Sequence, residues 1–183
     1  GREESGRLQG RTALVLGYGA IGRRIANACR GFEMHVIGVK RRLNDGKDSE
    51  TELFSIEQLP KLLPRADFLF VALPLSPATE GIIGADELAL LPDGATVVNI
   101  ARGPVIDEAA LFEALRSGRI RAGLDVWYTY PESEDARTTT APSAFPFHEL
   151  DNVVMTPHMA GHDAGGENRQ IAELAAMLNA AAN

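Results

Sequence analysis

The sequence has little cysteine and no long apolar run. Its 183 residues include one cysteine, Cys29, so a disulfide framework is excluded. Cys29 falls on the apolar face of a predicted helix, and we interpret it as a small core residue rather than a nucleophile. No apolar stretch approaches the ~18 residues of a membrane-spanning helix, and we find no signal-peptide pattern. We therefore expect a soluble, cytoplasmic protein without a membrane partner.

Positive charge is also scarce. The chain carries 25 acidic and 18 basic residues, which gives a formal net charge of −7. This balance argues against general nucleic-acid binding, so any attraction for phosphate must be local. The length fits one α/β domain that buries about 70% of the surface of its unfolded chain. Residues 1–10 are polar and lack apolar periodicity, so we expect a tail or linker there and one domain over residues 11–183.

What the sequence does contain is a glycine-rich turn between a predicted strand and a predicted helix. The turn has the spacing G-x-G-x-x-G and comprises Gly17, Tyr18, Gly19, Ala20, Ile21 and Gly22. In this motif the first glycine makes a tight turn, the second admits a pyrophosphate against the backbone, and the third lets helix and strand pack closely. The free amides at the start of the helix then bind phosphate.

The spacing alone is weak support, because a chain with 18 glycines produces it by chance. Its context is more specific. An apolar strand precedes the turn, a helical pattern follows from Arg23 to Arg30, and a second apolar run begins at His35, which completes a βαβ unit of about 30 residues. The alternative is an ordinary strand-to-helix turn. We interpret the unit as a dinucleotide site.

Six apolar segments predict a parallel sheet. They are Leu14–Leu16, His35–Val39, Phe68–Ala72, Thr96–Ile100, Ala122–Val126 and Val153–Met155. Helical patterns join most of them, and a terminal amphipathic helix begins near Gly166. Right-handed crossovers then place helices on both faces, so we predict an α/β, Rossmann-type doubly wound sheet in a single domain. Ligands in such sheets bind beyond the carboxyl ends of the strands.

The position that selects between NAD and NADP is basic in this chain. In an NAD site an acidic residue about 20 positions beyond the glycines accepts hydrogen bonds from the ribose. Here Lys40 stands 18 positions after Gly22 and is followed by Arg41 and Arg42. These side chains can pair with the 2′-phosphate of NADP, whereas the alternative is a solvated basic loop. We predict NADP as the cofactor, with NAD as the alternative.

Two residues after predicted strands are candidates for catalysis. Arg102 directly follows the fourth strand, where its guanidinium can hold a carboxylate by a bidentate pair; the alternative is a surface arginine. His158 follows the sixth strand, and a histidine titrates near neutrality, so it is the candidate general acid or base. We predict no metal site.

Five motifs in order resemble one known family. They are Gly17–Gly22, Leu73–Thr79, Asn99–Gly103, Gly123–Trp127 and Thr156–His158. Together they resemble the nucleotide-binding domain of the D-isomer-specific 2-hydroxyacid dehydrogenases. The resemblance runs from about Leu8 to Gly161, and the family's substrate domain is absent from this chain. The basic residues after the second strand are similar to those of the NADPH-dependent glyoxylate and hydroxypyruvate reductases of the family.

The resemblance implies hydride transfer between the nicotinamide and C2 of a small 2-oxo or 2-hydroxy acid, in a homodimer. It implies that Arg102 binds and polarises the substrate, that His158 exchanges the proton, and that Asp125 hydrogen-bonds the nicotinamide carboxamide. Arg102 and His158 are also expected to contact the cofactor, and the residues expected to complete its groove are Leu73, Pro74, Thr79, Ile100, Ala101 and Gly161. Because half of the cleft is absent, we expect the isolated chain to bind cofactor without turnover.

One departure from the family pattern concerns the partner of the histidine. The family has a glutamate before a proline, and this chain has Tyr130 there. Either Tyr130 takes over as the partner of His158, or Glu132 or Glu134 from the long loop replaces the carboxylate. Two rival functions also stay open: a dinucleotide-sensing interaction protein that resembles the family's corepressors, and a bare nucleotide-binding regulatory domain. Retention of both Arg102 and His158 favours the enzyme.

Overall fold

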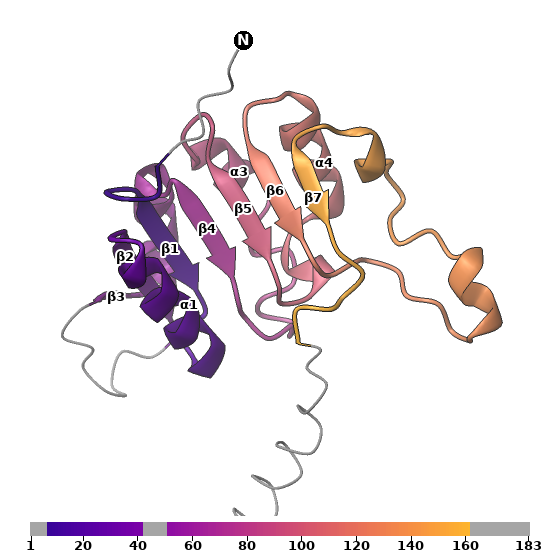
Figure 1. Cartoon of the computed structure of the whole chain (residues 1–183), viewed down its shortest axis with the longest axis horizontal. Coiled ribbons are helices and arrows are strands. Elements are labelled where there is room, and N and C mark those ends of the chain that lie inside the picture. The colour runs from indigo at the N-terminus through magenta and orange to yellow at the C-terminus, as the bar shows by residue number, and fades with distance from the viewer. Residues whose placement is uncertain (1–6, 42–50, 162–183) are drawn as a thin grey trace, which may run out of the picture.

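A parallel sheet of seven strands forms the centre of the structure (Figure 1). The computed structural model describes residues 7–41 and 51–161. The strands are β1 Thr12–Leu16, β2 His35–Lys40, β3 Glu52–Ser55, β4 Phe68–Val71, β5 Thr96–Asn99, β6 Arg121–Leu124 and β7 Val153–Met155. Their order is β3-β2-β1-β4-β5-β6-β7, so the direction of winding reverses between β1 and β4. The expected ligand crevice therefore lies beyond the carboxyl ends of these two strands.

The Rossmann-type prediction is confirmed, but the predicted number of strands is one too low. The missing strand is β3, which pairs with β2 in a register that sets Ile37 beside Glu52 and Lys40 beside Ser55. It contains four residues, is exposed at Glu52 and only half-buried over the rest. An edge strand of this length needs no continuous apolar run, so the pattern that identified the central strands is weak here.

Alternating side chains divide the core into two layers. Ala13 and Val15 of β1 pack with α1 (Ala20–Gly31), whereas Leu14 and Leu16 belong to the core on the other face. That second face is covered by α3 (Ala85–Leu90) and α4 (Glu108–Arg116), as Figure 1 shows. Burial on both faces explains why the central strands are apolar at consecutive positions.

The ends of the helices follow local sequence signals. Asp107 precedes α4, and its carboxylate accepts a hydrogen bond from the Ala110 amide at 2.8 Å, while Gly118 closes the helix with φ of +73°. Before α2 (Leu59–Leu62), the Ser55 amide donates to Gln58 Oε1 at 3.2 Å. A 3-10 turn, Leu63–Arg65, continues the helical path from α2 through Pro64.

The segment between β6 and β7 is long and fixed near its base. The Tyr128 amide donates to Pro142 O at 3.1 Å, and the Glu108 carboxylate accepts the Ser143 hydroxyl at 2.6 Å. Between these anchors, residues 131–141 project from the sheet in the orange part of Figure 1 and include a short 3-10 turn. We call residues 131–141 the excursion.

The terminal amphipathic helix predicted from Gly166 lies outside the described residues. Among residues 7–41 and 51–161, no helix is long and apolar enough to cross a membrane.

Candidate active site

The glycine loop has the geometry of a phosphate-binding turn. Gly17 has φ of +104°, and a Cβ at this position would lie 2.6 Å from Ala72 O. A Cβ at Gly22 would lie 2.2 Å from Gly17 O, so only glycine lets α1 start so close to β1. Helical hydrogen bonding begins with the Arg23 amide, which donates to Gly19 O at 2.9 Å. The amides of Ala20, Ile21 and Gly22 precede that bond, where a helix start binds phosphate.

Tyr18, the second residue of the motif, supports the loop from below. Its side chain is only 4% exposed, and its hydroxyl shares a 2.9 Å hydrogen bond with Thr51 Oγ1. A Cβ at Gly38 would lie 2.6 Å from the tyrosine ring, so the glycine in β2 makes room for it. The Tyr18 ring is therefore buried under the glycine turn and is not part of its exposed surface.

The predicted basic residues lie at the end of β2. Lys40 is the last residue of that strand and is half-buried, and Arg41 is exposed. Arg42 lies outside the described residues. Since β2 is the strand next to β1, the described part of this basic group stands beside the glycine loop.

The loop after β4 forms the neighbouring wall of the crevice. Leu73 is half-buried and Pro74 is exposed. Thr79 Oγ1 donates to Pro74 O at 2.7 Å and accepts from the Ser76 amide at 2.9 Å, so its hydroxyl holds the loop in shape. Leu75 is exposed here, as is Ile21 in the glycine loop. Both present apolar surface at the crevice that a bound nucleotide would cover.

Arg102 stands on a loop that a buried asparagine shapes. Asn99 at the end of β5 is 1% exposed. Its side chain accepts from the Ala101 amide at 3.0 Å and donates to Arg102 O at 3.1 Å. The Arg102 side chain is exposed, and its guanidinium donates to Ala101 O at 2.6 Å. Ile100 is half-buried before the turn, so the turn raises the arginine above the carboxyl edge of the sheet.

Asp125 holds the loop that carries His158. Its carboxylate accepts hydrogen bonds from Thr156 Oγ1 at 2.5 Å and from the amides of Met159 and Ala160 at 2.8 and 2.9 Å. Burial raises the pKa of Asp125, but these three donors, together with nearby His158, outweigh it and hold the pKa below its ordinary value. Both carboxylate oxygens are engaged by this loop.

The backbone of His158 is in the left-handed region, with φ of +55°. A residue with a Cβ pays roughly 1 to 2 kcal/mol for this conformation. The two backbone amides that follow His158 donate hydrogen bonds to the Asp125 carboxylate, so the aspartate stabilises the strained turn. Strained backbone of this kind gathers at functional positions. His158 and Gly161 are exposed.

The rings of Tyr130 and His158 lie beside each other. The two ring centroids are 5.5 Å apart with the planes tilted by 51°. The tyrosine hydroxyl accepts the Trp127 amide at 3.0 Å. Trp127 in turn donates its Nε1 proton to Thr156 O at 3.1 Å, next to the histidine loop. The geometry thus gives Tyr130 a packing contact with the imidazole and a hydrogen bond elsewhere.

The arginine loop and the histidine loop are linked through Trp127. A Cβ at Gly103 would lie 2.3 Å from Trp127 O, so the residue after Arg102 packs directly on this backbone. Trp127 also holds Thr156 O. A shift of one loop must therefore disturb the other. Three residues that shape the site, Asn99, Trp127 and Thr156, are not among the site residues predicted from the sequence. Asn99 could have been identified, because it is a polar residue at the end of a buried apolar strand.

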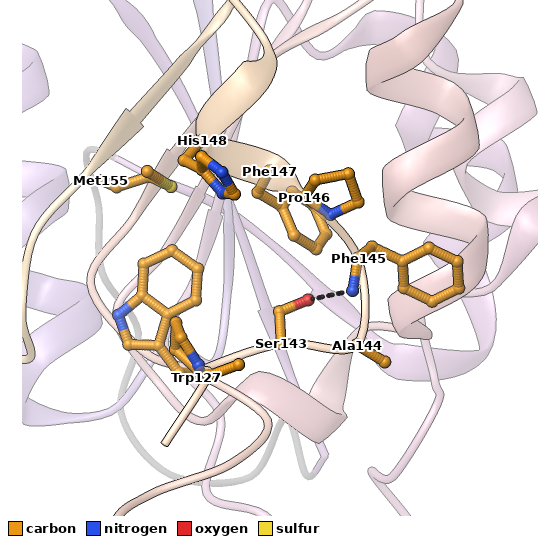
Figure 2. A pocket seen from close by; sticks show the side chains of 10 residues that line it. Trp127, Ser143, Ala144, Phe145, Pro146, Phe147, His148 and Met155 are labelled. Atoms are coloured by element: carbon orange, nitrogen blue, oxygen red, sulfur yellow. Dashed lines mark hydrogen bonds between the residues drawn. The ribbon is translucent and has the colours of Figure 1, made fainter. Parts of the chain in front are cut away.

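Two cavities lie beside this arrangement. The larger, of about 920 Å³, is lined by Trp127, Thr129, Tyr130, Pro131, Arg137, Thr140, Pro142, Met155, Thr156, Pro157 and His158. The smaller, of about 340 Å³, lies between Trp127, Met155, His148 and the 141–147 segment (Figure 2). It contains neither Arg102 nor His158, so we do not assign it to the reaction. In the described part of the chain, no three His, Cys, Asp or Glu side chains gather as metal ligands.

Comparison with known proteins identifies the family to which the chain belongs. Residues 1–160 match the model of the D-isomer specific 2-hydroxyacid dehydrogenase, NAD binding domain. D-3-phosphoglycerate dehydrogenase of Methanocaldococcus jannaschii is 37% identical over 152 residues, which are 82% of this chain and 27% of the relative. Hydroxypyruvate reductase of Thermotoga maritima is 35% identical over 169 residues, or 91% of this chain and 51% of the relative.

The fold comparison includes a cofactor complex. The D-isomer specific 2-hydroxyacid dehydrogenase from Xanthobacter autotrophicus Py2, in complex with NADPH and MES, superposes with a TM-score of 0.77 at 36% identity. The match covers 93% of this chain and 67% of that one. The chain spans about a quarter to a half of the two curated relatives named above. The glycine turn, the sheet order and the matched residues establish that this chain belongs to the D-isomer specific 2-hydroxyacid dehydrogenase family and contains its NAD-binding domain.

Proposed function

We propose that this protein is an NAD(P)-dependent D-2-hydroxyacid dehydrogenase that interconverts a small 2-oxo acid and its 2-hydroxy acid. The observation that carries the proposal is the linkage of Arg102 and His158 at the carboxyl edge of the sheet. Asn99 and Gly103 fix one loop, Asp125 fixes the other, and Trp127 contacts both. Polar side chains on fixed loops at the carboxyl edge of such a sheet are candidates for substrate binding and acid–base chemistry.

The glycine loop fits a dinucleotide. Close approach at Gly17 and Gly22 leaves no room for a Cβ, and the amides of 20–22 precede the first helical hydrogen bond. When bound, NAD(P)H supplies the hydride for reduction at C2. Arg102 would bind the substrate carboxylate by a bidentate pair and polarise the 2-oxo group. His158 would donate a proton to the carbonyl oxygen during reduction and remove it during oxidation.

We propose that NADP(H) is the preferred cofactor. Lys40 and Arg41 place positive charge at the end of β2, where an acidic side chain would select NAD. A relative that binds NADPH supports this preference, although the family model is described only as NAD binding. Arg42 extends the same basic run in the sequence.

The experiment for the general function is an NADPH oxidation assay of the full-length gene product with glyoxylate, hydroxypyruvate and pyruvate. We expect turnover with at least one acid, and we expect Arg102→Gln and His158→Gln to lower kcat/KM by about 10² to 10⁴. Cofactor binding without turnover of any acid would favour the corepressor-like alternative. Light scattering on the same sample tests the proposed homodimer, which must have twice the mass of one chain.

A further inference from the structure

The 920 Å³ cavity beside His158 is larger than the smallest 2-oxo acids require. Small-molecule pockets range over roughly 300 to 1,000 Å³, so this cavity is near the upper end. Glyoxylate has no side chain to place in it. Because His158 and Tyr130 are part of its lining, a ligand that fills the cavity contacts the group that exchanges the proton.

The chemical character of the lining favours an anion on an apolar stem. Trp127, Tyr130 and Met155 supply apolar surface, and the threonines at 129, 140 and 156 supply polar groups. Arg137 is the one lysine or arginine in this lining, and no aspartate or glutamate belongs to it. Among the lining residues, Arg137 is therefore the one side chain with a permanent charge.

Arg137 is placed in the cavity wall by the excursion. Its known partner is Glu134, at 3.6 Å, and the two side chains are 68% and 85% exposed. Exposed pairs of this kind are weak, so the guanidinium can exchange Glu134 for a ligand at little cost. The base of the excursion is fixed by Glu108, which accepts from Ser143 Oγ and from the Ala144 amide at 2.9 Å.

From this arrangement we propose that the cavity is a subsite for the substrate side chain, and that Arg137 binds a second anionic group at its far end. The inference rests on the proposed function, and it narrows the substrate to 2-oxo acids with a distal carboxylate or phosphate. Charge-assisted hydrogen bonds from a guanidinium suit either group.

The test is a binding titration that needs no turnover. Trp127 is the only tryptophan among the 183 residues and lines the cavity, so its fluorescence reports occupancy. With NADP⁺ bound and ionic strength held constant, the ligands are 2-oxoglutarate, 3-phosphohydroxypyruvate, 2-oxobutyrate and phenylpyruvate. We expect a 2-oxo acid with a distal carboxylate or phosphate to bind roughly tenfold or more tightly than 2-oxobutyrate. Comparison of the first two acids distinguishes between the distal groups.

Matched variants separate the subsite from general charge. Arg137→Gln should abolish the preference for dianions, and Arg137→Lys should restore part of it. Arg116→Gln is the control, because Arg116 forms the same exposed pair, three residues from Glu113, on α4. An unchanged preference in Arg137→Gln, or tightest binding of phenylpyruvate, overturns the proposal. If the full-length protein turns over no 2-oxo acid, the proposed function fails, and this titration still decides whether the dianion subsite exists.

Discussion

At the scale of single residues, the account depends on what surrounds His158. The imidazole contacts the ring of Tyr130, and its backbone turn is held by Asp125. Sequence alone placed Tyr130 where the family has a glutamate, and the structure brings the two rings together. The sequence did not indicate that the tyrosine hydroxyl accepts a hydrogen bond from the Trp127 amide, because that contact depends on how the chain turns after β6.

The first prediction concerns the pH limb of reduction in the full-length enzyme. A carboxylate beside an imidazole favours its charged form, and a neutral phenol does not. Reduction should therefore decline at lower pH than in relatives with a His-Glu pair. Tyr130→Glu should move this limb upward. If Glu132→Gln or Glu134→Gln shifts the profile while Tyr130→Phe does not, a loop carboxylate is the partner.

The second prediction concerns Asp125. Its pKa is lower in the folded protein, so its contribution to stability is present above its ordinary pKa of about 3.9 and is lost as pH falls through the folded value. Asp125→Asn should lower the free energy of unfolding by about 1 to 3 kcal/mol at pH 7, since a buried carboxylate with three donors is replaced. It should also flatten the dependence of stability on pH as the pH falls below the ordinary pKa of about 3.9. Exposed Asp135→Asn is the control, and equal slopes in the two variants would contradict the assignment.

At the scale of elements, the sequence predicts the strands that are buried on both faces of the sheet and misses the edge strand and the loop contacts. Consecutive apolar residues mark the central strands, and Asp107 marks the start of α4. The edge strand β3 carries no such signal, and neither does the fixed base of the excursion, since the Glu108 contacts join positions 35 and 36 residues apart. Long-range hydrogen bonds of loops leave no local pattern.

The third prediction belongs to the end of β2. Titration of the protein with both cofactors should show tighter binding of NADP(H) than NAD(H), by about tenfold to hundredfold, because one or two charge-assisted contacts to the 2′-phosphate contribute ~1.5 to 3 kcal/mol. A Lys40→Ala, Arg41→Ala double variant should lose most of the difference while keeping its NAD affinity. Arg23→Ala and Arg24→Ala on exposed α1 positions serve as controls of similar charge. Equal affinities in the wild type would exclude the preference.

At the scale of the whole molecule, the sheet presents one face of a cleft. The two curated relatives named above are two to nearly four times longer than the matched segment, and under the proposed function the additional length supplies part of the pocket for the acid. We predict that the 183 residues alone bind NADP(H) but do not turn over a 2-oxo acid, because positioning that contributes ~7 to 11 kcal/mol to the barrier is incomplete. Calorimetry measures the binding, and steady NADPH oxidation by these residues alone would refute the claim.

The most direct test of the central claim follows the transferred hydrogen. The full-length protein is incubated with a 2-oxo acid that it consumes and with NADPH deuterated at C4 of the nicotinamide, on each face in separate reactions. The account predicts that one of the two labelled cofactors delivers deuterium to C2 of the product, and that this 2-hydroxy acid has the D configuration. His158→Gln should suppress the product. Product without deuterium from either cofactor, or a hydroxy acid of the L configuration, would contradict the account.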